Sequence, residues 1–349
     1  MDQLPLVGSL ISNRFRITRL LGAGSMGEVY AAEHVSLNRT YAIKLLNEQA
    51  ENDRMMVERF RREALATSRL NHPNIVYISD FGETETGQLF LVMEYIPGQN
   101  LRLALQTIAP RRLPWLRGLG ILVQLASALE AAHGAGVVHR DLKPDNVVLT
   151  QRPGREDLVK VLDFGLAKIM VDTELSLLTR QGEVFGTPAY MSPEQALGAN
   201  LDHRTDLYSL GVMAYELITG HLPFEYGSLP RVLVAHQEEE PPSMKTHLAR
   251  GEVLPEGLES LVRHCLAKAP ADRPASAAEV GEALEACRAT LSEILTTAPI
   301  VKESTQVAKR PRPAPPEAVV VDSGAMVRTL AATDPRIWGC ADEGAQEAR

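Results

Sequence analysis

The chain has 349 residues, of which 45% are hydrophobic and 23% charged, and its formal net charge is −8 at pH 7. This composition excludes a fibrous or globally disordered chain, and the negative charge argues against a main role in binding a nucleic-acid backbone. The length predicts about two folding units with a tail. The three cysteines, Cys265, Cys287 and Cys340, are far apart, which favours unpaired thiols in a reducing cytoplasm.

The sequence gives no sign of export or membrane insertion. No basic segment followed by an apolar one opens the chain, as a secretory signal requires. The most apolar stretch, residues 119–132, contains Gln124 and Glu130 and is shorter than the roughly 18 residues of a spanning helix. We therefore expect a cytoplasmic protein without a transmembrane segment.

Short segments of alternating apolar and polar residues, separated by glycine, predict strands between residues 15 and 46. In residues 52–70 the apolar residues recur instead at three- to four-residue steps among many charges, which predicts an amphipathic helix. Two further apolar runs, 75–78 and 89–95, predict strands on either side of a glycine-containing turn at 83–87.

Beyond Pro97-Gly98 the pattern becomes mostly helical as far as about Arg288. The chain is thus predicted to form a small β-rich unit with one helix, followed by a larger helical unit. Residues 289–349 are rich in proline and show neither a helical nor a strand period, which predicts a flexible tail.

The first candidate functional motif is the glycine-rich segment Gly22-Ala23-Gly24-Ser25-Met26-Gly27-Glu28-Val29. Glycines let backbone amides approach phosphate oxygens without intervening side chains. A dinucleotide-binding loop would continue into a helix, whereas residues 29–32 continue as a strand, and the lysine of a Walker-type loop is missing. Taken alone, the motif is also compatible with a plain hairpin turn.

The second candidate is Lys44, which ends the apolar strand segment Tyr41-Ala42-Ile43-Lys44. A strand lysine usually lies at the surface. If Lys44 points inward it needs an anionic partner, because an unpaired buried ammonium group is costly. Glu63, on the predicted amphipathic helix, is our choice, although the same helix carries other acids such as Glu58.

The third motif is His139-Arg140-Asp141-Leu142-Lys143-Pro144-Asp145-Asn146, followed later by Asp163-Phe164-Gly165. It places a carboxylate, an ammonium group and an amide in one loop, and the alternative is a polar surface loop. With the glycine-rich segment and Lys44 preceding it in this order, the chain resembles the protein kinase family.

The resemblance implies a role for each residue of the third motif that carries chemistry. Asp141 orients the attacking hydroxyl and accepts its proton, and Lys143 neutralises charge on the γ-phosphoryl group. Asn146 and Asp163 hold Mg²⁺, with Mn²⁺ as the alternative, and the metal offsets charge on the transferring group. Catalysis of this kind consists mostly of positioning and electrostatics.

The resemblance also implies an ATP site. Lys44, oriented by Glu63, anchors the α and β phosphates. The backbone of residues 93–96 binds adenine, and Met93 narrows the pocket behind it. The residues implied to contact ATP are Leu21, Gly22, Ala23, Gly24, Ser25, Met26, Gly27, Glu28, Val29, Ala42, Lys44, Met93, Glu94, Ile96, Val148 and Asp163. In isolation, each apolar member is more typical of simple core packing.

The substrate class follows from two further features of the resemblance. Lys143 is the residue that serine/threonine kinases carry at this position. The segment Gly186–Glu194 resembles the one that holds the substrate's hydroxyl residue, and its Ser192 is typical of bacterial kinases of the eukaryotic type.

Supporting residues are implied as well. Asp206 resembles a buried helix aspartate that braces the catalytic loop, and Arg273 is expected to pair with Glu194. A phosphate on the activation segment would dock on Arg140 and order the segment. The candidates for phosphorylation are Thr173, Ser176 and Thr179, of which Thr179 is favoured; an unmodified, solvated threonine is the alternative.

We therefore predict an α+β protein with the bilobal protein kinase fold, in which a small β-rich N-lobe with one helix precedes a larger, mainly helical C-lobe. Its expected partners are protein substrates with Ser/Thr hydroxyls and a second copy for autophosphorylation, with no nucleic acid. A pseudokinase scaffold and a small-molecule kinase are the alternatives. The implied segments are an N-terminal extension (1–13), a catalytic domain (14–288) comprising N-lobe (14–93), hinge (94–98) and C-lobe (99–288), and a tail (289–349).

Overall fold

The structure is a computed structural model, and the part of the chain that it describes has five gaps. The described residues are 6–24, 27–46, 54–108, 112–150, 157–164 and 188–297. The predictions for Ser25, Met26, Gly165, the three candidate phosphorylation sites and the tail beyond Thr297 concern residues outside these ranges. The backbone of Glu63 is described but its side chain is not.

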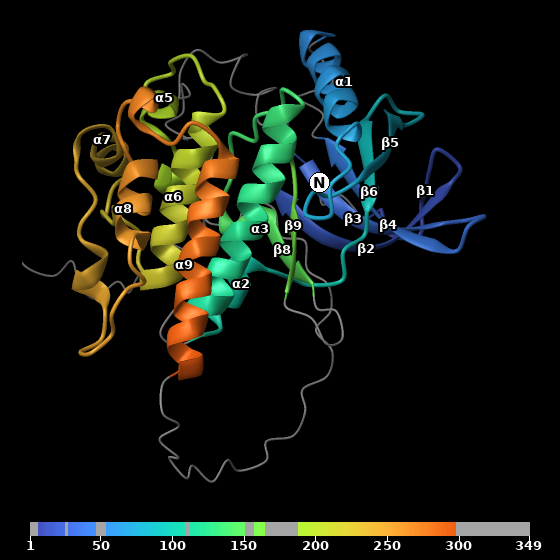
Figure 1. Ribbon diagram of the computed structural model, residues 1–349. Helices are drawn as coiled ribbons and strands as arrows, with labels where there is room; N and C mark the ends of the chain where they lie inside the picture. The colour runs from blue at the N-terminus through green and yellow to red at the C-terminus, as the bar shows by residue number, and fades with distance from the viewer. Residues whose placement is uncertain are drawn as a thin grey trace, which may run out of the picture.

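An antiparallel sheet with the strand order β1-β2-β3-β4-β6-β5 forms the N-lobe (Figure 1). Its strands are β1 (Leu10–Ile11), β2 (Phe15–Gly24), β3 (Gly27–His34), β4 (Arg39–Leu46), β5 (Ile78–Glu83) and β6 (Leu89–Glu94). In β2, Phe15 and Ile17 are buried whereas Arg16 and Thr18 are exposed. This alternation places one face of the strand on the core and confirms the predicted strands at 15–46.

Two strands differ from the predicted segments. β1 lies within residues 1–13, which we expected to be an extension, and is too short to show a strand period in the sequence. The strand predicted at 75–78 is wrong in extent, because β5 begins only at Ile78. Ile75 instead forms an isolated parallel bridge with Val161 in the C-lobe, so this segment joins the lobes.

Helix α1 (Arg54–Ser68) packs beside β5 and confirms the predicted amphipathic helix (Figure 1). Phe60 and Ala64 are four residues apart, so they lie on one face of the helix, and both are buried. This face fixes the helix to the sheet.

The C-lobe consists mainly of helices, with a small sheet of strand order β7-β8-β9 at the junction with the N-lobe (Figure 1). The helices are α2 (Leu101–Gln106), α3 (Trp115–Gly134), α5 (Pro193–Ala196), α6 (Arg204–Thr219), α7 (Leu229–Glu238), α8 (Leu258–Cys265) and α9 (Ala277–Thr297). The small strands are β7 (Gln99–Asn100), β8 (Val147–Thr150) and β9 (Leu158–Val161). Short 3-10 helices are η2 (Pro144–Asn146), η3 (Pro188–Tyr190), η4 (Met244–His247) and η5 (Pro270–Asp272).

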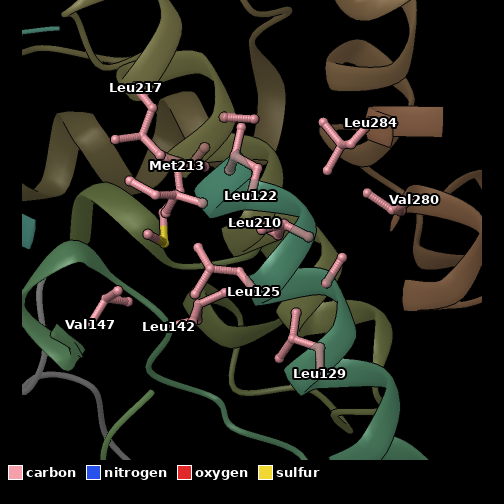
Figure 2. Packing of buried hydrophobic residues seen from close by; sticks show 14 of the residues in the cluster. Leu122, Leu125, Leu129, Leu142, Val147, Leu210, Met213, Leu217, Val280 and Leu284 are labelled. Atoms are coloured by element: carbon pink, nitrogen blue, oxygen red, sulfur yellow. The ribbon is translucent and has the colours of Figure 1, made fainter. Parts of the chain in front are cut away.

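Helix α3 forms the centre of the C-lobe core, between α6 and α9 (Figure 2). Leu125 of α3 shares one buried cluster with Met213 of α6 and Leu284 of α9. Leu142 and Val147, which belong to the loop after α3 and to β8, are buried in the same cluster (Figure 2). Burial of such a side chain contributes roughly 1.5–3 kcal/mol, so the polar residues between these two anchors are held in place by the core.

The end of α9 lies beyond the predicted end of the catalytic domain. Cys287 and Leu291 of this helix are both buried, and the helix continues past Arg288 to Thr297. The C-lobe therefore extends beyond Arg288, the residue near which the sequence pattern predicts the helical unit to end. Within the described ranges, no helix is both long and apolar enough to cross a membrane.

A buried histidine on α7 predicts that the C-lobe loses stability in mild acid. His236 is completely buried, and its Nδ1 lies 2.9 Å from the hydroxyl of Tyr208. Burial, helped by the positive charge of Lys268, lowers the pKa of His236 from 6.5 to about 4. Between these values the unfolded chain binds a proton that the folded protein does not, so stability falls as pH falls from 6.5 towards 4.

The expected loss is about 3 kcal/mol over this window. Urea unfolding of the wild type and of His236→Asn at pH 7 and pH 4.5 measures it. The wild type should lose more stability than the variant on acidification, and equal losses would contradict the assignment.

Candidate active site

The loop 139–146 follows α3 and is fixed by a buried aspartate of α6. Asp206 accepts hydrogen bonds from the backbone N–H groups of His139, at 2.8 Å, and Arg140, at 2.7 Å, and from the His133 ring, whose Nε2 is 2.8 Å away. Burial alone would raise the pKa of Asp206, but the hydrogen bond and charge of His133 outweigh it and lower the pKa. The carboxylate is therefore ionised, and the predicted bracing role is confirmed.

Two residues of the site adopt left-handed backbone conformations that non-glycine residues rarely occupy. Arg140 has φ 68° and Asp163 has φ 54°. Such residues cost about 1–3 kcal/mol each and persist where the surroundings hold them. For Arg140 these surroundings are Asp206 and Gln195, whose Nε2 donates to the Arg140 carbonyl at 2.6 Å.

Asp141, Lys143 and Asn146 converge as predicted. The Lys143 Nζ lies 2.8 Å from Oδ2 and 3.0 Å from Oδ1 of Asp141. The Asn146 Nδ2 donates to the Asp141 backbone carbonyl at 2.8 Å and to its Oδ2 at 3.1 Å. Lys143 is fully buried whereas the Asp141 side chain is 25% exposed, so the oriented carboxylate is the group that an incoming hydroxyl can reach.

Lys44 points inward from β4 and joins the two lobes. Its side chain is 2% exposed, and its Nζ lies 2.9 Å from Oδ2 of Asp163, which is 24% exposed. The inward orientation agrees with the sequence prediction, whereas the contact with Asp163 was not foreseen. Glu63 lies on α1, but because its side chain is outside the description, its pairing with Lys44 stays a prediction.

Phe164 links the helix of the N-lobe to the catalytic loop. Its ring packs edge-on against His139, with 4.6 Å between the ring centroids, and its carbonyl accepts a hydrogen bond from Thr67 of α1 at 3.2 Å. Sequence reasoning missed Thr67, because no local pattern distinguishes it from other helix threonines.

The apolar residues predicted around adenine lie in one buried cluster to which both lobes contribute. Strand pairing sets Val29 beside Lys44 and Ala42 beside Met93. Leu162 of the C-lobe belongs to the same cluster and was missed, although its position directly before Asp163 could have indicated it. The cluster members among the predicted contacts are Leu21, Val29, Ala42, Met93, Ile96 and Val148.

The side chain of Glu94 forms hydrogen bonds with both lobes, to Tyr77 of the N-lobe and to Lys160 of the C-lobe. Its Oε1 accepts hydrogen bonds from the backbone N–H of Tyr77, at 2.9 Å, and from the Nζ of Lys160, at 2.5 Å. Lys160 also donates to the Ile75 carbonyl at 3.2 Å. Any contact of Glu94 with adenine would therefore use its backbone, and Lys160 is a positioning residue that the sequence did not reveal.

The described residues of the glycine-rich segment lie at the end of β2 and the start of β3, which pair antiparallel. Gly22 pairs with Val29, Ala23 with Glu28 and Gly24 with Gly27. A Cβ on Gly27 would lie 1.9 Å from the Leu45 carbonyl oxygen. Close approach to β4 is thus a reason for glycine at this position, in addition to the phosphate contact predicted from the sequence.

The described part of the segment expected to hold the substrate, residues 188–194, is tied to the catalytic loop and to α6, because the hydroxyl of Thr205 in α6 donates to Glu194 at 2.7 Å. Ser192 caps α5 in a capping box with Gln195, and Gln195 in turn contacts Arg140. Glu194 forms two hydrogen bonds of 2.7 Å with Arg273, which confirms the predicted pair. Residues 188–194 are therefore fixed relative to Asp141.

The residues predicted to bind metal suit Mg²⁺ chemically. The amide nitrogen of Asn146 is committed to Asp141, which leaves its Oδ1 as an oxygen donor, and Asp163 supplies a carboxylate. Hard cations such as Mg²⁺ prefer such oxygen ligands and keep several waters and phosphate oxygens. No group of three or more His, Cys, Asp or Glu side chains suited to a metal occurs in the described ranges.

Two lobes are joined by a short segment, and a buried lysine, two carboxylates and an amide meet at their junction, which is the arrangement that the resemblance to protein kinases implies. The family model for the protein kinase domain matches residues 15–285, so the chain belongs to the protein kinase family. The bilobal α+β fold expected from the sequence is confirmed.

The chain is similar to bacterial serine/threonine-protein kinases. It is 47% identical to pkn3 of Myxococcus xanthus over 274 residues, which are 78% of this chain and 49% of the relative. It is 37% identical to PknA of Mycobacterium tuberculosis over 289 residues, 82% of this chain and 64% of PknA. The crystal structure of the PknI kinase domain of M. tuberculosis matches with a TM-score of 0.63 and 30% identity, over 80% of this chain and 98% of that domain.

The shared region is shorter than the curated relatives. It amounts to 49% of pkn3, 33% of pkn2 and 39% of Pkn1, all from M. xanthus. The similarity therefore concerns the catalytic unit, and whole-protein activity, substrates and partners are matters for proposal.

Proposed function

We propose that the protein transfers the γ-phosphoryl group of ATP to serine and threonine hydroxyls of proteins. The observation that carries this proposal is the convergence of Asp141, Lys143 and Asn146 in one loop beside the ion pair of Lys44 and Asp163. This set provides a proton acceptor, cations for the phosphates and oxygen ligands for a metal, as phosphoryl transfer requires.

In the proposed reaction, Asp141 orients the substrate hydroxyl and takes its proton as the oxygen attacks the γ-phosphorus. Lys143 stabilises negative charge on the γ-phosphoryl group, and Lys44 anchors the α and β phosphates. Asn146 and Asp163 hold Mg²⁺, with Mn²⁺ as the alternative, which offsets charge on the phosphate oxygens when bound. The apolar cluster that contains Val29, Ala42 and Val148 encloses the adenine base.

The proposal includes features of the whole protein. Protein substrates bind along the segment Gly186–Glu194, and a second copy provides the activation segment for autophosphorylation. The location is cytoplasmic. The catalytic domain begins near residue 14 and extends past Arg288 to the end of α9.

Transfer of labelled phosphate from ATP tests this function against its two alternatives. We expect labelled phosphoserine or phosphothreonine in a generic protein acceptor. A pseudokinase would bind nucleotide without labelling any acceptor, and a small-molecule kinase would label metabolites but no protein. Either outcome would refute the proposal, while the presence of every catalytic residue and the segment around Ser192 favour a protein kinase.

If the activation segment between Lys168 and Gly186 is phosphorylated, a variant that lacks the phosphorylated residue should activate slowly. Thr179 lies outside the described residues, but Arg140, beside Asp141, offers a cation to which its phosphate would bind. We expect Thr179→Ala to activate several-fold more slowly during incubation with ATP, whereas Thr173→Ala serves as the matched control. Mass spectrometry that finds fully active enzyme without phosphate between Lys168 and Gly186 would disprove the idea.

A further inference from the structure

Arg102, on the first turn of α2, lies among acidic and phenolic groups next to the catalytic loop. Its Nη1 donates to Glu216 Oε1 at 2.7 Å and its Nε to Asp145 Oδ2 at 3.3 Å. Its Nη2 donates to the hydroxyl of Tyr190. The side chain is only 14% exposed, so it acts as an internal counter-ion and none of the catalytic residues named above contacts it.

The partners of Arg102 are arranged around its planar guanidinium group. The Tyr190 hydroxyl donates to Glu216 Oε2 at 2.5 Å, and burial and the charge of Glu216 raise the pKa of this tyrosine, which keeps it protonated. Asp145 and Glu216 are thus two buried acidic side chains that share the guanidinium group of Arg102. Arginine suits this task because its fork of donors serves several acceptors in fixed directions.

Two of these partners, Asp145 and Tyr190, belong to the segments that the proposed function places at the substrate. Asp145 stands between the catalytic-loop residues Lys143 and Asn146 in sequence. Tyr190 belongs to the segment that, in the proposed function, holds the hydroxyl-bearing residue of the substrate. A basic residue near that hydroxyl would find Asp145 and Glu216 as its natural acceptors, but Arg102 already neutralises both.

We infer that Arg102 is a specificity-determining residue: it fills the carboxylate pair Asp145/Glu216 and so makes the enzyme indifferent to arginine or lysine near the phosphoacceptor. A substrate cation could bind only by displacing a preorganised, buried arginine. Without Arg102, the two acids would lack their counter-ion and would select a cation from the substrate. The inference rests on the proposed function, since it names the substrate class of the same site.

A positional peptide library tests the inference with the full chain and ATP. The peptides carry one serine and, at each neighbouring position in turn, arginine or alanine. For the wild type, the two rates should agree within about twofold at every position. Arg102→Met keeps the bulk of the side chain, and it should phosphorylate the arginine peptide about tenfold faster than the alanine peptide at one position. The double variant Arg102→Met/Glu216→Gln should lose that preference.

Two controls make the result decisive. Arg117→Met removes an arginine that pairs with Asp157, away from this cluster, and should leave the profile flat. Addition of guanidinium chloride at millimolar concentration should raise the melting temperature of Arg102→Met, but not that of Arg117→Met, because the small cation replaces the lost group.

Opposite results would overturn the inference. If Arg102→Met folds and has the same peptide profile as the wild type, Asp145 and Glu216 do not select a cation from the substrate. If Arg102→Met fails to fold, the inference is tested with the peptide profile of the wild type. A wild-type preference for arginine that Glu216→Gln abolishes would show that Asp145 and Glu216 bind a substrate cation although Arg102 is present. A wild type that phosphorylates no peptide or protein would instead refute the proposed function itself, which distinguishes the two failures.

Discussion

Replacing Asp141 with alanine is expected to lower the rate of phosphoryl transfer by about 10²–10⁴-fold. The carboxylate of Asp141 is held by Lys143 and Asn146 and remains partly exposed, so it is the group placed to accept the hydroxyl proton. Because Lys44 and Asp163 are unchanged in this variant, ATP binding should persist. Single-turnover transfer of labelled phosphate, with ATP affinity measured in parallel, separates the two effects.

Asp272→Ala is the matched control for this prediction. Asp272 is an exposed aspartate in the 3-10 helix η5, so its loss should leave the transfer rate unchanged. Equal labelling by wild type and Asp141→Ala would contradict the assignment of Asp141.

Breaking the buried pair of Arg273 and Glu194 should have the largest effect on stability. Both side chains are almost fully buried, and Arg273 also donates to the Ala267 carbonyl at 2.8 Å. Loss of one member strands a buried charge, which costs about 3–5 kcal/mol. We expect Arg273→Leu and Glu194→Gln each to lower the free energy of unfolding by this order, as measured by urea denaturation.

A double-mutant cycle and an exposed pair provide the controls. The double variant should lose less than the sum of the single variants, because no charge is left unpaired. Arg288→Ala, at the more exposed pair with Glu285, should cost less than about 1 kcal/mol. A loss of that small size in Arg273→Leu would show that the buried pair is not an anchor of the substrate segment.

Residues of the site that are close in sequence could be predicted from the sequence. The loop from His139 to Asn146 brings its polar groups together within a few residues, and two apolar anchors, Leu142 and Val147, are visible within the same stretch. For these positions, local sequence and tertiary structure point to the same arrangement. The inward position of Lys44 was implied by the family resemblance and not by its strand, because residues 42–46 are all buried and show no alternation.

Contacts between distant elements could be predicted only where the family resemblance implied them, as for Arg273 with Glu194. Arg102 meets Asp145 and Glu216 only because α2, the catalytic loop and α6 converge, and no spacing rule relates these residues. The contact of Lys160 with Glu94 likewise joins the two lobes. The ends of two elements were predicted wrongly for a different reason. Strand β1 is too short to show a hydrophobic period, and helix α9 continues into a stretch whose hydrophobic period is less regular.

The most direct test of the site is the dependence of ATP affinity on Mg²⁺, measured by titration calorimetry with the wild type and Asp163→Asn. If Lys44, Asn146 and Asp163 surround one metal-bound triphosphate, Mg²⁺ should strengthen ATP binding to the wild type, and the variant should lose most of this gain. Identical affinities with and without Mg²⁺ in the wild type, or an undiminished gain in Asp163→Asn, would contradict the account.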